Sequence, residues 1–196
     1  MHRLALCLLG LLVGTGLQAA EADKPREISL TSTNLAGRSS LLVATVPAGF
    51  TATIKDLPGP KARSSMQALS AESADQRVQL LITLMPPEDF LQKDAAGLEM
   101  LLHKTSAPFV GGSVEGKVTP LPLKLTHGIG VATIFSDKSE VGKPEAKGRG
   151  HYKLLTNGII RVGDATLASV SIFSDSKEAA GYLDALKLVA SLRPTK

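Results

Sequence analysis

Short apolar stretches separated by turn residues run along most of the chain, a pattern typical of antiparallel strands. In the first half of the chain, strands are expected at residues 28–31, 41–46, 50–54 and 78–84. The fourth stretch has apolar residues at every second position, and its remaining positions mix polar and apolar residues. This composition predicts a central strand that is covered on both faces.

Turn residues indicate how these strands pair. The segment Pro47-Ala48-Gly49 predicts a turn, so residues 41–56 are interpreted as one hairpin. Residues 64–73 are expected to form a second hairpin with the strand at 78–84.

Two segments carry apolar residues at spacings of three and four, which predicts amphipathic helices. The first helix is expected to carry Glu88 and Asp89 in its first turn, where carboxylates suit the positive end of the helix dipole. Its apolar stripe is Leu91, Ala95, Leu98, Leu101 and Leu102, and it is expected to end at Ala107-Pro108 and Gly111-Gly112. The second helix is expected at residues 176–192, before Pro194, with a stripe of Ala179, Tyr182, Leu183, Leu186, Val189 and Ala190.

The second half of the chain adds expected strands at residues 117–125, 129–135, 152–156, 159–162 and 165–173. Asn157-Gly158 tolerates positive φ at both centres of a type I′ turn, which predicts a hairpin at this pair. Gly163-Asp164 fits either a turn or a bulge. The order of strands, helix, strands and helix indicates an α+β fold: an antiparallel sheet of about six or more strands with two helices packed on it.

The N-terminus has the pattern of a secretory signal peptide, with a basic start before an apolar run at residues 4–16 and small residues after it. Cleavage is expected between residues 19 and 22, which divides the chain into a signal peptide (1–20), a loose mature terminus (21–27) and a single α+β domain (28–196). The apolar run is shorter than the roughly 20 residues that span a bilayer, so no membrane span is expected.

A periplasmic or secreted location follows from this leader. Cys7 is the one cysteine of the chain and lies within the apolar run, after a bulky Leu6 that does not suit a lipoprotein signal. No lipid anchor is therefore expected, and the mature chain has no cysteine for a disulfide, a thiolate nucleophile or a metal site. A domain without disulfides favours a bacterial periplasm over a eukaryotic extracellular space.

The net charge of +4 arises from 22 basic and 18 acidic residues that are scattered along the chain. Nucleic-acid binding requires a clustered basic face with stacking or base-reading residues. No nucleic-acid partner is expected, and the charge is attributed to solubility.

The order of elements, together with two short motifs, resembles the Mog1/PsbP-like group of α/β/α sandwich proteins. The motifs are Val46-Pro47-Ala48-Gly49-Phe50, similar to a P-x-G-aromatic turn, and Ala190-Ser191-Leu192-Arg193, similar to an S-L-R/K finish. The strand–Pro–helix stretch at residues 84–104 also fits. The resemblance implies the sandwich fold and a non-enzymatic role, as in photosystem accessory subunits and chaperone-like adaptors, with no catalytic set to carry over.

Three histidines follow the leader: His103, expected in the last turn of the first helix, His127 in a turn, and His151 at the start of a strand. Each stands alone in its segment, whereas zinc sites show local pairs of ligands, so no metal site is predicted.

Glycine and serine motifs also predict no cofactor or nucleophile. Gly128-Ile129-Gly130 lacks the third glycine of a dinucleotide loop and leads into a strand. Gly111-Gly112 lacks the following Lys-Ser/Thr of a P-loop, and Ser113, Ser169 and Ser171 lack the G-x-S-x-G pattern of a hydrolase. The polar loop at residues 137–149 is interpreted as a solvated connection, with a binding loop as the alternative.

The sequence therefore favours a non-enzymatic accessory or protein-binding module, which holds a protein partner by a sheet face or edge. The alternative is a small-ligand-binding protein or a hydrolase whose site is assembled from distant segments. That alternative predicts a deep pocket in which His or carboxylate side chains converge. No catalytic, cofactor-binding or metal-binding residue is assigned from the sequence.

Overall fold

The computed structural model describes residues 24–34, 36–58, 64–85, 94–144, 152–164 and 166–195. The strands in chain order are β1 (Arg26–Thr33), β2 (Ser39–Val46), β3 (Phe50–Pro58), β4 (Ser65–Ser73), β5 (Val78–Leu84), β6 (Leu121–Leu123), β7 (Gly128–Ser136), β8 (Leu154–Val162), β9 (Thr166–Ser174) and β10 (Arg193–Pro194). The helices are α1 (Ala95–Val110), the short 3-10 helix η1 (Lys138–Glu140) and α2 (Ala180–Ala190). The predicted α+β class is confirmed.

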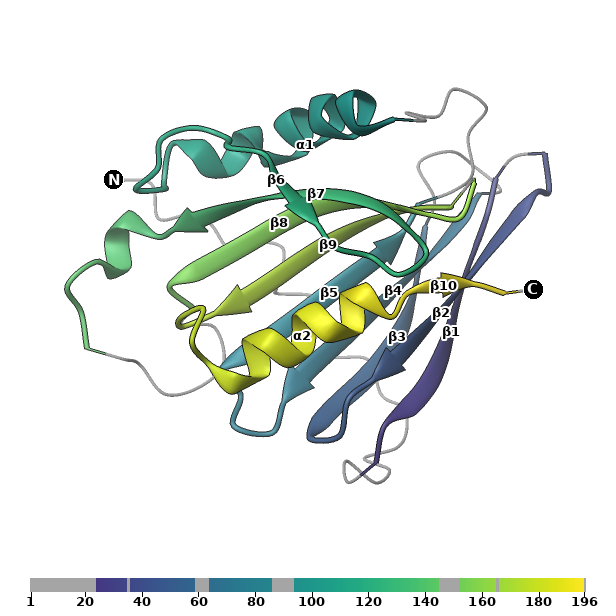
Figure 1. Ribbon diagram of the computed structural model, residues 1–196, viewed down its shortest axis with the longest axis horizontal. Helices are drawn as coiled ribbons and strands as arrows, with labels where there is room; N and C mark the ends of the chain where they lie inside the picture. Colours follow the sequence, from purple (N-terminus) through teal and green to yellow (C-terminus); the bar gives the residue numbers. More distant parts are fainter. Residues whose placement is uncertain are drawn as a thin grey trace.

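The ten strands form one antiparallel sheet that curls into a half-barrel (Figure 1). The order across the sheet is β10-β2-β1-β4-β5-β9-β8-β7-β6, and β3 pairs with β4 outside this path. The predicted hairpin of β4 and β5 is confirmed, with five residues of each strand in register from Ala68↔Thr83 to Glu72↔Gln79. Every described strand pair is antiparallel, so short turns and loops make most of the connections.

The two helices cover opposite faces of this sheet. Leu98 and Leu102 of α1 pack with Ile159 of β8, whereas the buried residues of α2 pack with Ile160, the next residue of the same strand. Successive side chains of a strand point to opposite faces, so neighbouring residues of β8 contact different helices. Figure 1 shows α1 along β7 and β8, and α2 in front of β5 and β9.

A buried hydrogen bond holds each helix to β8. The hydroxyls of Thr156 and Tyr182 lie 2.8 Å apart and join β8 to α2. Asn157 donates through Nδ2 to Ser106 Oγ of α1 at 2.8 Å, and its Oδ1 accepts from Ser171 Oγ of β9 at 3.2 Å. Ser106 and Asn157 are buried, so each group satisfies the other where water has no access.

The hairpin predicted at Asn157-Gly158 is wrong. Both residues lie in the middle of β8, where Gly158 pairs with Ala132 of β7 and Val170 of β9. A Cβ atom on Gly158 would lie 3.0 Å from Leu123 Cδ1 and 3.2 Å from Val131 O, so the close packing here leaves little room for a side chain. The Asn-Gly pair permits a turn but does not require one, and the contacts of Asn157 favour the strand.

The hairpin predicted for residues 41–56 is also wrong. A turn does follow β2, with Gly49 at a φ of +80°, but β2 pairs with β1 along its whole length. The chain then leaves that pair, and β3 lies on β4, where Ala74 N donates to Gly49 O at 2.9 Å. Local turn chemistry predicted the turn, and long-range pairing decided which strands it joins.

Helix α1 begins later than predicted, and it ends at the predicted Gly111-Gly112 stop rather than at Ala107-Pro108. It begins at Ala95, where Asp94 Oδ1 accepts from Gly97 N at 2.9 Å, and Glu88, Asp89 and Leu91 lie outside the described residues. It continues through Pro108 to Val110, because a proline so close to the end removes one backbone hydrogen bond and little helix follows it.

Helix α2 is shorter than predicted and presents a slightly different stripe. Tyr182 and Val189 are buried as expected, but Leu183 is 52% exposed, and Ala185 and Leu188 are buried instead. The helix ends at Ala190, before the predicted residue 192.

The residues after α2 close one end of the half-barrel. Ser191 Oγ accepts from Thr45 N of β2 at 3.2 Å, and Leu192 is fully buried. Arg193 and Pro194 then pair with β2 as strand β10, and Arg193 forms a salt bridge of 2.8 Å with Glu27 of β1. Ser191, Leu192 and Arg193 therefore attach the C-terminal segment to β2 and β1, and we call these three residues the C-terminal clasp. Pro194 belongs to a strand rather than to a helix end.

Several strand bounds also differ from their predictions. β1 begins at Arg26, so the first two of its residues fall in the segment predicted to be a loose terminus. β6 covers only Leu121–Leu123 of the stretch predicted at 117–125. Gly163 has a φ of +60° between the paired residues Val162 and Thr166, which makes the ambiguous Gly163-Asp164 pair a hairpin turn.

We expect Asn157→Ala to lower the free energy of unfolding by about 1–3 kcal/mol, because Ser106 keeps a buried hydroxyl without its partner. The double variant Ser106→Ala/Asn157→Ala should lose less than the sum of the two single variants. Urea unfolding of the four proteins measures this coupling. Ser169→Ala, on the same face of β9, serves as the control and should change stability by about 0.5 kcal/mol or less. Additive losses would show that the Asn157–Ser106 contact does not anchor α1.

Candidate functional site

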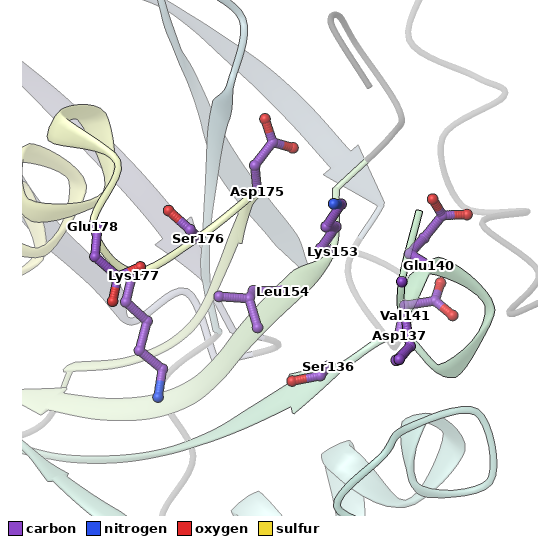
Figure 2. Close-up of a pocket in the computed structure, with 11 residues that line it drawn as sticks. Ser136, Asp137, Glu140, Val141, Lys153, Leu154, Asp175, Ser176, Lys177 and Glu178 are labelled. Carbon is purple, nitrogen blue, oxygen red and sulfur yellow. The ribbon is translucent and has the colours of Figure 1, made fainter. Parts of the chain in front are cut away.

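A hollow of about 420 Å³ lies where η1, the start of β8 and the connection from β9 to α2 meet (Figure 2). Its lining residues are Ser136, Asp137, Glu140, Val141, Gly142, Lys153, Leu154, Asp175, Ser176, Lys177 and Glu178. These segments are distant in sequence, which is the arrangement expected for a site assembled from separate elements.

Local hydrogen bonds fix the position of η1, which forms one side of the hollow. Asp137 Oδ1 accepts from Ser139 N at 2.7 Å and caps η1, and Asp137 N donates to Lys153 O at 2.9 Å. Lys138 N donates to Gly112 O at 3.0 Å, which connects η1 to the end of α1. The polar segment after β7 is thus attached to β8 and α1 at its start. Residues 145–149 of the predicted loop lie outside the described residues.

Three of the charged lining side chains have structural partners. Glu140 forms a 3.0 Å salt bridge with Lys143, and Lys153 Nζ donates to Lys143 O at 2.7 Å. Asp175 has a side chain only 3% exposed and accepts from Arg77 Nε at 3.1 Å. The first two bonds join η1 and the start of β8 to Lys143, and the third joins the β9–α2 connection to the β4–β5 turn. The observed contacts of these groups therefore explain their positions without a substrate.

Asp75 and Arg77 form a small polar network at the β4–β5 turn. Ser73 Oγ donates to Asp75 Oδ1 at 2.6 Å and Arg77 N donates to the same oxygen at 3.1 Å. The Ser73 hydroxyl holds the pKa of Asp75 below its ordinary value; partial burial opposes this, and the N–H and charge of Arg77 add to it. The carboxylate stabilises a turn in which Gln76 has a φ of +57°.

Glu115 is a second carboxylate close to the hollow. Partial burial acts to raise its pKa, but hydrogen bonds from Ser136 N at 2.8 Å and Ser136 Oγ at 2.9 Å outweigh burial. The charge of Lys177 lowers the pKa of Glu115 further, so this carboxyl also titrates below its ordinary range. A carboxylate with a lowered pKa is a poor general base at neutral pH, because it binds a proton weakly.

The histidines do not form a site. His103 is exposed in the middle of α1, not in its last turn as predicted, because the helix extends to Val110. His127 is exposed in the turn before β7, and His151 lies outside the described residues. Over the described ranges, no group of three or more His, Cys, Asp or Glu side chains is arranged to hold a metal ion.

Gly128, Gly130 and Ser113 of the glycine and serine motifs have structural roles. A Cβ atom on Gly128 would clash with Arg161 O, and one on Gly130 would lie 2.8 Å from Ile160 Cγ2, so both glycines allow β7 to approach β8. Ser113 Oγ bonds at 3.1 Å with both Val110 O and Gly116 N, and so stabilises the end of α1.

The free edge of β3 is a feature that sequence reasoning did not place. Along the described part of the chain, the sheet ends at β10, at β6 and at β3. β10 has two residues including Pro194, and β6 has three residues with Pro122 at its centre. β3 has nine residues, and its proline is the last of them. Proline and short length protect a sheet edge from further pairing, so β3 is the least protected edge.

The direction of the backbone groups on β3 follows from its pairing with β4. Ala74 N donates to Gly49 O, and these residues are the next pair after Phe50↔Ser73, the first pair of the β3–β4 register. Hydrogen-bonded pairs alternate along an antiparallel ladder, so Thr51, Thr53 and Lys55 face β4 with their N–H and C=O groups. The N–H and C=O groups of Ala52, Ile54 and Asp56 therefore point to the open edge.

Side chains along this strand are mostly exposed. Thr51, Thr53 and Asp56 are exposed, and Ile54 is a large hydrophobic residue with 41% of its surface accessible. Within the described ranges, the edge therefore offers backbone groups without a strand partner, together with an accessible apolar side chain. A proline at position 58 was the one sequence signal of an edge, because a central strand does not tolerate it.

We expect the Asp75 carboxylate to stabilise the fold above a pH of about 4 and to lose this effect as the pH falls through its lowered folded-state pKa. Asp75→Asn should therefore lower the free energy of unfolding at neutral pH and lower it much less at about pH 2.5. Urea unfolding at both pH values measures the difference. Ser73→Ala removes the main cause of the shift and should reduce the pH dependence in parallel, whereas an equal loss at both pH values would contradict the assignment.

No helix in the described ranges combines the length and the apolar character needed to cross a membrane. Comparisons of the chain with protein-family models, with curated proteins and with solved structures find no match. The Mog1/PsbP-like resemblance therefore stays a prediction from the two motifs and the order of elements.

Proposed function

We propose that this protein is an exported, non-enzymatic binding module of Mog1/PsbP-like type that holds a protein partner by strand addition at β3. The observation that carries the proposal is the outward direction of the N–H and C=O groups of Ala52, Ile54 and Asp56 on a nine-residue edge strand. An extended segment of another chain provides the matching alternation of donors and acceptors.

The binding free energy available at the edge of β3 is larger than that at a flat polar surface, for two reasons. A new strand makes several backbone hydrogen bonds at once, each contributing about 0.5–1.5 kcal/mol net. Burial of the exposed Ile54 side chain adds an apolar contribution of about 25 cal/mol for each Å² removed from water. Backbone bonds provide affinity in strand addition, and the side chains along the edge select the partner sequence.

The sandwich resemblance supports a module of this class. The two helices lie on opposite faces of the sheet, and both motif segments have structural roles: Gly49 directs the chain onto β4, and Ser191 and Arg193 attach the C-terminus to β2 and β1. Because both motif segments contact β1, β2 or β4, neither of them occupies the outer edge of β3, where we propose that the partner binds.

A small-ligand-binding role is the second candidate, favoured by the hollow of about 420 Å³ assembled from η1, β8 and the β9–α2 connection. Three of its charged side chains make the structural bonds described above, which supports the strand-addition proposal in preference.

Expression of the full chain in a bacterial host with a periplasm should yield exported protein whose first residue lies between positions 20 and 23. The basic start and apolar run are recognised by the export machinery, and the small residues that follow are accepted by the peptidase. Intact-mass measurement of the periplasmic fraction gives the cleavage position. Leu11→Arg interrupts the apolar run and should retain the chain in the cytoplasm. A wild-type chain that keeps Met1 and stays in the cytoplasm would contradict export.

Affinity capture tests strand addition, with the mature chain (residues 21–196) as bait in extract of its native compartment and an untagged copy added. Ile54→Pro removes an outward N–H and should reduce capture of a stoichiometric partner at least tenfold, while β3–β4 pairing is preserved. Leu183→Lys, an exposed hydrophobic residue on α2, is the matched control and should capture as the wild type does. Circular dichroism confirms that the baits are folded.

Thr53→Pro separates binding from folding, because its N–H points to β4 and its loss should lower the melting temperature by several degrees. A partner retained by Ile54→Pro would disprove binding at this edge. Absence of any partner would redirect the search to small ligands of the hollow.

A further inference from the structure

We infer that the partner strand at this edge is β3 of a second copy, paired antiparallel about a two-fold axis at Ile54. This inference rests on the proposed function and specifies its partner.

The free donors on the edge form a symmetric set. Phe50 N already donates to Pro47 O at 3.4 Å, and Pro58 has no N–H group. Between these two residues, the outward N–H groups are those of Ala52, Ile54 and Asp56. The set is symmetric about Ile54, so two antiparallel copies of it pair completely, with Ala52 opposite Asp56 and Ile54 opposite itself.

In an antiparallel pair of β3 strands, the outward backbone groups of one copy must lie opposite those of the other. The register between the two copies can therefore change only in steps of two residues. A shift toward the C-terminus places Lys55 directly opposite the same lysine of the second copy, and like charges in that position destabilise a strand pair. A shift toward the N-terminus moves Ile54 opposite Ala52, which is buried in its own chain. The register centred on Ile54 avoids both problems.

This register also accounts for the one large exposed hydrophobic side chain of β3. Ile54 is 41% exposed, and two copies of it would lie directly opposite on the same face of a continuous sheet. Each isoleucine then covers part of the other, which a polar partner segment would not do. The central apolar pair is flanked by Thr53 opposite Lys55, so no like charges are opposed.

One strand pair buries less area than the roughly 1,200–2,000 Å² of a stable protein interface. We therefore expect a reversible, concentration-dependent dimer rather than an obligate one. The other two borders of the described sheet, β6 and β10, are short and contain proline, so assembly stops at two copies instead of extending into a fibre.

Disulfide trapping tests the register directly. In a Cys7→Ser background, Ile54→Cys places two thiols at the axis, where paired Cα atoms are about 5.5 Å apart and within disulfide range. Diamide accepts the two electrons and two protons released when the disulfide forms. We expect most of this variant to migrate as a covalent dimer on a non-reducing gel.

Thr51→Cys is the matched control on the same strand. In the expected register it lies opposite Leu57, so the two Thr51 positions are about 20 Å apart and cannot be joined. Trapping of Thr51→Cys as efficiently as Ile54→Cys, or failure of Ile54→Cys to cross-link, would overturn the register.

Sedimentation equilibrium of the mature chain over a hundredfold concentration range measures self-association without cross-linking. Wild type and Leu183→Lys should shift from monomer to dimer, and Ile54→Pro should remain monomeric throughout. A wild-type chain that stays monomeric while Ile54→Pro loses a different captured protein would refute self-pairing and leave strand addition intact. A monomeric chain whose capture is unaffected by Ile54→Pro would refute both.

Discussion

The pleat of β8 is the constraint on which the rest of the structure depends. Thr156 bonds to Tyr182 of α2, and the next residue, Asn157, bonds to Ser106 of α1. Because successive side chains of a strand point to opposite faces, one strand holds a helix on each side of the sheet. A shift of β8 by one residue would place each polar group against the wrong helix, so its register relative to β7 and β9 is strongly specified.

From this centre the sheet curls toward β2, and α2 lies inside the curl. The residues after α2 then attach the C-terminus to the first two strands. Ser191 bonds to β2, Leu192 is buried, and Arg193 pairs with β2 and forms a salt bridge with Glu27 of β1. This C-terminal clasp covers part of the border formed by β2. The border formed by β3 lies outside the main order of strands and receives no such cover from the described part of the chain.

The hollow beside η1 and the edge of β3 differ in how their polar groups are paired. In the hollow beside η1, Glu140, Lys153 and Asp175 have partners that serve the fold, and the lowered pKa values of Asp75 and Glu115 come from bonds that stabilise turns and loop contacts. At the edge of β3, by contrast, three successive outward N–H groups face away from their ladder. The proposed strand addition would use these groups.

The sequence by itself determined the elements with strong internal periodicity: the strands at β5 and β9, the hairpin of β4 with β5, both helices and the α+β class. It did not determine pairing between segments distant in the chain. Asn157-Gly158 suits a turn when read alone, yet Asn157 lies beside Ser106 and Gly158 beside Leu123, contacts that no local pattern contains. The turn before Phe50 was correctly predicted, but only the tertiary structure placed β3 on β4 and left its other edge without a neighbour among the described strands. Periodicity records which face of an element is buried, whereas the choice of neighbours depends on contacts across the whole fold.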